Sequence, residues 1–231
     1  MSSNSYPRRG ITLALAGLLA LASKLVVLAV SGTHEGHAAT GHDHGAATHV
    51  RTAKQLAFHD AMRRLWQDHG TWTDHAIDSF VDGAPDLNAA VARLLANQTD
   101  IGNAVKPFYG RAGGAKLTRL LKAHINDAVG VLKAVKSGDS SQITASEAAF
   151  SRNGNQIAAF LHTANPHFWS LPAMRKMMRV HLNQVLALAT DRFKGHYAAE
   201  AREYDVYIDH IQSMADMLSS GIIGQFPNRF R

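Results

Sequence analysis

Apolar residues recur every three or four positions over most of the chain after about residue 53, which is the period of an α-helix with one buried face. Glycine, proline and aspartate interrupt this pattern and predict helices over about 53–81, 86–104, 115–136, 141–163, 171–193 and 196–221. No alternating pattern predicts a strand, and no repeat of fixed period is evident. Short linkers place consecutive helices antiparallel. The sequence therefore predicts an all-α, up-and-down bundle of about six helices over residues 53–231.

The first 31 residues follow a different pattern. Arg8 and Arg9 precede an apolar run over 11–23, and Lys24 separates this run from a second one that ends near residue 31. A basic region followed by an apolar segment is typical of a signal peptide, and the whole stretch is also long enough for a membrane anchor. Because basic flanks stay in the cytoplasm, we predict an N-terminal export or anchor helix, with the bundle outside the cytoplasm. The membrane is then a partner if this leader remains uncleaved.

Residues 32–52 form a linker rich in histidine, glycine and alanine. Its histidines are His34, His37, His42, His44 and His49. This composition does not form a packed core and predicts a flexible segment. Clustered neutral imidazoles bind Cu²⁺, Zn²⁺ or Ni²⁺, so the tract is a candidate metal-capturing segment. The alternative is a solvating linker in which the histidines are incidental.

Composition excludes several kinds of function. The chain has no cysteine, which rules out disulfides, thiolate chemistry and cysteine-ligated zinc. The net charge is +6, but three basic residues lie in the leader, and no dense basic run with interleaved aromatic residues predicts nucleic-acid binding. Glutamate is scarce and the Glu-x-x-His pattern of di-iron bundles is absent. Since no nucleophile, phosphate-binding or dinucleotide-binding motif is present either, we expect a protein that is not an enzyme.

Three histidines lie inside the apolar seams of three different predicted helices. His69, His124 and His181 each follow a large apolar residue by three positions. Buried imidazoles need partners for both nitrogens. If the three face one another, they form a site for copper, zinc or nickel, with Asp100 and Asp205 as the expected interior carboxylates. Alternatively, a separate polar neighbour satisfies each histidine, which then only fixes the helix register.

Four stretches of the chain resemble one group of bacterial proteins. They are LWQDHGTWTDHAIDSF, ARLLANQTDIGNAVKPFYG, QIAAFLHTANPHF and YDVYIDHIQSMADMLSSGIIGQFP. The group comprises secreted or envelope proteins with helical folds, and the likeness covers about residues 60–227. No activity is established for the group, so the resemblance implies a helical fold and assigns no catalytic residue.

Together these features predict an extracytoplasmic binding protein for a transition metal ion. The flexible tract would capture the ion and the interior histidines would hold it. The alternative is a non-catalytic envelope scaffold, or an interaction or sensor module with a protein partner, whose buried histidines serve only structure.

Overall fold

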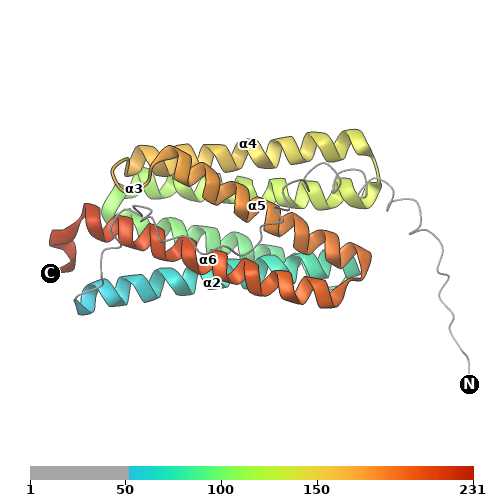
Figure 1. Ribbon diagram of the computed structural model, residues 1–231, viewed down its shortest axis with the longest axis horizontal. Helices are drawn as coiled ribbons and strands as arrows, with labels where there is room; N and C mark the ends of the chain where they lie inside the picture. Colours follow the sequence, from blue (N-terminus) through green and yellow to red (C-terminus); the bar gives the residue numbers. More distant parts are fainter. Residues whose placement is uncertain (1–51) are drawn as a thin grey trace, which may run out of the picture.

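The computed structural model of the protein describes residues 52–231. The expected leader and the five histidines of the linker lie outside the described residues. The helices are α2 (Ala53–Asp82), α3 (Leu87–Ser137), α4 (Ser140–Ala164), α5 (Leu171–Lys194) and α6 (Tyr197–Gln225), followed by the 3₁₀-helix η1 (Pro227–Phe230). Residues 52–231 contain no strand, which confirms the all-α prediction. Successive helical segments run in alternating directions along one long axis (Figure 1).

The bundle has five helices where six were expected, because α3 contains two of the predicted helices. Gly110 interrupts α3 with φ 72° and ψ 173°, a backbone conformation that glycine adopts without steric penalty. The chain folds back there: a Cβ added to Gly114 would lie 2.5 Å from the carbonyl oxygen of Gly102. The two halves of α3, 87–109 and 111–137, therefore pack closely against each other. The loop expected over 106–114 was wrong, because a turn at one glycine replaces it.

Local signals place most of the helix starts where the sequence predicted them. Thr52 and Gln55 form a reciprocal capping box at the start of α2. The Asp139 carboxylate accepts hydrogen bonds from two backbone amides at the start of α4, and the Ser170 hydroxyl accepts one at the start of α5. Pro172 occupies the first turn of α5, where no intrahelical donor is lost.

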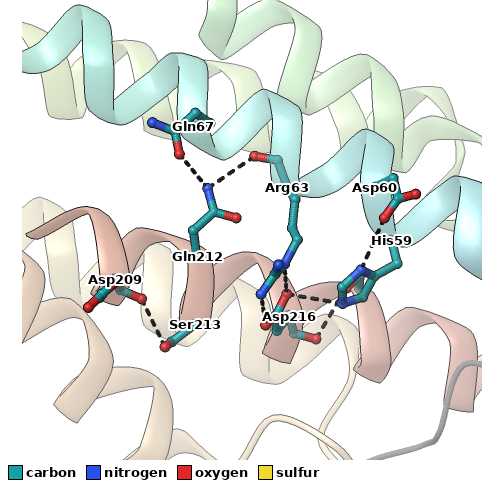
Figure 2. Close-up of polar contacts among 9 residues, drawn as sticks. His59, Asp60, Arg63, Gln67, Asp209, Gln212, Ser213 and Asp216 are labelled. Atoms are coloured by element: carbon teal, nitrogen blue, oxygen red, sulfur yellow. Dashed lines mark hydrogen bonds and ion pairs between the residues drawn. The ribbon is translucent and has the colours of Figure 1, made fainter. Parts of the chain in front are cut away.

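A polar network holds α2 against α6, and Figure 2 shows it. The Arg63 guanidinium donates to both carboxylate oxygens of Asp216 at 2.6 and 2.7 Å. His59 Nε2 lies 3.0 Å from the same carboxylate, and the Gln212 amide donates to Gln67 Oε1 at 2.8 Å. The ion pair is solvent-exposed, so its contribution to stability is small, on the order of 1 kcal/mol or less. Its role is to fix the relative position of the two helices.

Apolar side chains from all five helices form the core between these helices. Among the helices of residues 52–231, none combines the length and the apolar character that a membrane span requires.

Candidate functional site

The three seam histidines converge in the centre of the bundle. His69 on α2, His124 on the second half of α3 and His181 on α5 are 3%, 3% and 2% exposed. The His181 ring lies between the other two, with ring centroids 5.7 Å from His69 and 5.6 Å from His124. The sequence could not show whether the three shared one level of the bundle, and the structure places them together.

The three histidines occupy equivalent positions in three helical hairpins. Hairpin 1 is α2 with the first half of α3, hairpin 2 is the second half of α3 with α4, and hairpin 3 is α5 with α6. In each hairpin, a polar side chain on the second helix donates a hydrogen bond to the backbone carbonyl of the residue four positions before the histidine. The pairs are Asn97 to Leu65 at 2.9 Å, Asn153 to Leu120 at 3.1 Å and His210 to Met177 at 3.2 Å. The sequence concealed this repeat because the histidines are spaced by 55 and 57 residues and few other residue identities are shared.

Asn153 fixes the tautomer of His124. Asn153 Nδ2 donates to the Leu120 carbonyl, so its Oδ1 faces His124 Nδ1 at 2.9 Å. An amide oxygen only accepts, and His124 Nδ1 must therefore carry the proton. The lone pair of His124 is then on Nε2.

Gln98 holds His69 from hairpin 1. Gln98 Nε2 lies 3.1 Å from His69 Nδ1, 2.9 Å from the Leu94 carbonyl and 3.1 Å from Asn97 Oδ1. In this orientation Nδ1 of His69 accepts and Nε2 carries the proton. Three acceptors share the two amide protons, while Gln98 Oε1 has no hydrogen-bond partner within residues 52–231. Rotation of this amide by half a turn would let Oε1 accept from His69 Nδ1–H and free the Nε2 lone pair. The same rotation would break the hydrogen bonds that Gln98 Nε2 donates to the Leu94 carbonyl and to Asn97 Oδ1.

His181 lacks the amide partner that the other two histidines have. His210 stands at the corresponding position of hairpin 3, with its ring 6.4 Å from that of His181 and its Nε2 bound to the Met177 carbonyl. His181 Nδ1 is buried and has no hydrogen-bond partner among the described residues. A buried polar atom without a partner is unfavourable by about 1–3 kcal/mol, so an additional ligand at this nitrogen would replace no existing hydrogen bond among residues 52–231.

Burial keeps these imidazoles neutral. Desolvation lowers the pKa of His69 to about 3 and that of His124 to about 4, and it lowers the pKa of His181 well below its usual value. Repulsion between the protonated forms of neighbouring histidines adds to this effect for His69 and His181. Each ring therefore keeps one unprotonated nitrogen at neutral pH, which is the form that binds a metal.

The two predicted carboxylates are not part of this site. Asp100 is 51% exposed and lies 3.9 Å from the Arg93 guanidinium, and Asp205 is also exposed. Their assignment to the interior was wrong, because each stands two residues from an inward-facing side chain, Gln98 and Tyr207 respectively. Two residues correspond to about 200° around a helix, which turns the carboxylate to the opposite face.

A second polar group, which the sequence did not reveal, joins α2 to α6. Carboxylate oxygens of Asp74, Asp78 and Glu200 lie within 4.8 Å of one another. Burial raises the pKa of Asp74 to about 6 and that of Glu200 to about 7, and the nearby Asp78 adds to both shifts. The Arg192 guanidinium lies 3.3 Å from Asp78 and 3.4 Å from Glu200. Because Arg192 already supplies positive charge here, the simplest function of this group is an ion-pair bridge between helices.

Gln98 is one residue of the histidine site that sequence reasoning missed, and Tyr207, whose buried ring stacks on that of His181, is another. Gln98 lies between Leu94 and Ile101 on an inward-facing seam and is 0% exposed. A glutamine in that phase is the same signal that identified the three histidines.

Comparison of the chain with protein-family models, curated proteins and solved structures finds no match. The resemblance to bacterial envelope proteins therefore stays a prediction.

Proposed function

We propose that this protein binds one transition metal ion, of the copper, zinc and nickel class, at His69, His124 and His181. The observation that carries the proposal is that three buried, neutral imidazoles from three hairpins lie together, with the rings of His69 and His124 each next to that of His181. In addition, His181 Nδ1 has no hydrogen-bond partner among the described residues. Neutral imidazole is a preferred ligand of these ions.

The ring spacing supports this proposal. A zinc–nitrogen bond is about 2.0–2.1 Å long, so two imidazoles on one ion have ring centroids roughly 5–5.5 Å apart at tetrahedral to trigonal angles. The observed separations of 5.7 and 5.6 Å are only slightly larger. The His124 and His181 rings are stacked, with an interplanar angle of 28°. Among residues 52–231 only Asp74, Asp78 and Glu200 bring three possible ligand atoms within 4.8 Å of one another, so coordination by the three histidines requires their rings to rotate as well as to approach.

One of the surrounding hydrogen bonds also favours a metal. Histidine ligands usually donate their second ring nitrogen to an oxygen acceptor, which orients the ring. His124 already does so through Asn153 Oδ1. His69 would do so only after rotation of the Gln98 amide, which would break the hydrogen bonds of that amide to the Leu94 carbonyl and Asn97 Oδ1.

The experiment separates the bundle site from the histidine tract. The full chain, with all five tract histidines replaced by serine, is incubated with Zn²⁺, Cu²⁺ or Ni²⁺, dialysed, and analysed for bound metal and for melting temperature. We expect one tightly bound ion per chain and a higher melting temperature. His181→Leu should abolish both effects, and His75→Leu, a surface histidine paired with Asp86, should leave both unchanged.

If no ion is retained and melting is insensitive to metals, the metal proposal fails. The histidines would then act only in packing, as expected for an envelope scaffold or interaction module.

We further propose that the bundle functions outside the cytoplasm, on the basis of the basic and apolar leader over residues 8–31. A reporter phosphatase that is active only outside the cytoplasm, fused after residue 52, should be active. Loss of that activity after replacement of Arg8 and Arg9 by glutamate would support the orientation. An inactive fusion to the unaltered leader would refute it.

A further inference from the structure

An apolar cavity of about 260 Å³ lies beside the histidine site. Its lining includes, in each hairpin, the residues four and eight positions after the histidine: Thr73 and Ile77, Ala128 and Leu132, Val185 and Ala189. These six positions share the inward face of the helices that carry the histidines. The cavity therefore occupies the bundle interior about one helical turn beyond the imidazoles.

Direct contacts join the cavity wall to the histidines. The Thr73 hydroxyl donates to the His69 carbonyl at 2.8 Å. The Phe150 ring, which lines the cavity, stacks on the His124 ring with centroids 4.6 Å apart. A molecule in the cavity would consequently lie next to side chains that contact two of the three histidines.

The lining defines the chemistry of an occupant. Lys133 and Asn88 line the cavity but are exposed, so they mark the end that reaches the surface. Deeper in the cavity, the lining side chains that the structure describes are apolar except for the Thr73 hydroxyl. No charged group there would compensate a buried charge, and Lys133 at the open end would repel a cation, so a positively charged occupant is disfavoured.

The volume sets the size of the occupant. An apolar cavity of about 150 Å³ is sufficient for benzene, and a volume of 260 Å³ is larger by more than half. Protein interiors rarely retain voids of this size because an unfilled cavity loses packing contacts.

We propose that this cavity is a binding site for a small, uncharged, mainly apolar molecule of roughly ten non-hydrogen atoms. The site is distinct from the metal site, and its occupancy does not require a metal.

The test uses the full chain freed of metal with a chelator. 1-Octanol is the probe, and octylammonium is its charged counterpart of matched size, which Lys133 at the open end cannot neutralise. Binding is measured by calorimetry and by ligand-observed NMR. We expect saturable binding of 1-octanol with one site per chain, and binding of octylammonium at least tenfold weaker.

Two phenylalanine substitutions on the same helix locate the binding. Ala128→Phe places a ring in the cavity and should weaken 1-octanol binding at least tenfold. Ala123→Phe adds the same ring at an exposed position and should leave binding unchanged. If Ala128→Phe does not fold, Ala128→Met serves as the smaller filling variant.

Three results would overturn the proposal: no saturable binding of 1-octanol up to its solubility, equal binding by the filled variant, or equal binding of octylammonium. Because the protein is metal-free, none of these outcomes depends on whether the histidines bind an ion.

Discussion

Replacement of His181 by leucine should stabilise the metal-free protein. The His181 side chain is 2% exposed, and its Nδ1 has no hydrogen-bond partner in residues 52–231. Removal of one unpaired buried polar atom is worth about 1–3 kcal/mol. Leucine is of similar size and adds apolar contacts to a core that contains Met178 and Val185. Burial lowers the pKa of His181, so the ring is neutral at pH 7 and no favourable charge interaction is lost.

We therefore expect the free energy of unfolding to rise by about 2 kcal/mol. For a domain of this size, that change corresponds to an increase of about 4–8 °C in melting temperature. The assay is equilibrium unfolding in urea at pH 7 with a chelator present, followed by circular dichroism.

His124→Leu is the matched control, because His124 is equally buried but has a partner. Its loss would leave the buried Asn153 Oδ1 without a donor, at a cost of about 1–3 kcal/mol. We expect this variant to be less stable than the parent. A His181→Leu protein that is destabilised by more than about 1 kcal/mol would refute the reasoning, since it would mean that the His181 nitrogens are satisfied in the native state.

Three further predictions concern acid stability, metal affinity and packing. The pKa of His124 is about 4 in the folded protein and about 6.5 when unfolded, so its contribution to stability is present above pH 6.5 and is lost as the pH falls. Between pH 7.5 and 5.5, the free energy of unfolding from urea titrations should fall by about 1.4 kcal/mol more for the parent than for His124→Leu. Equal losses in the two proteins would contradict this. Gln98→Glu gives His69 Nδ1–H a carboxylate acceptor and should raise metal affinity about tenfold in chelator-competition titrations, whereas unchanged or weaker binding would argue against His69 as a ligand. Gly102→Ala should lower the free energy of unfolding by about 1–3 kcal/mol, because the added Cβ would overlap the facing half of α3. Gly130→Ala has open space around its Cβ and should raise the free energy of unfolding by about 0.5–1 kcal/mol. Similar urea midpoints for the two variants would contradict the close packing at Gly102.

Helix starts could be predicted from the sequence because their signals are local. Asp139 and Ser170 act on amides two or three residues away, so the printed sequence contains both partners of each cap. Gly110 shows the limit of this reasoning. Glycines and a proline around it predicted an irregular loop, but the close approach of Gly102 and Gly114 across the fold allows helix to continue on both sides of a single residue.

The candidate site was predicted in part. The apolar phase of the seams identified His69, His124 and His181 as interior residues, and all three are buried. The same phase, applied to Asp100 and Asp205, would have placed both carboxylates on outer faces. The choice of those two rested on residue chemistry without helical phase, and the structure corrects it.

The sequence alone determined the fold class, most of the helix starts and the burial of the three histidines, because helical period, capping and hydrophobicity act over a few residues. Only the tertiary structure decided that the three histidines meet at one level of the bundle and that an apolar cavity adjoins them. It also decided that Gln98 and Asn153 bind two of the histidines, while His181 Nδ1 has no hydrogen-bond partner among the described residues. These facts depend on how far each helix slides along its neighbours. That displacement is set by side-chain packing between segments some 30 to 110 residues apart, and no periodicity within a single helix records it.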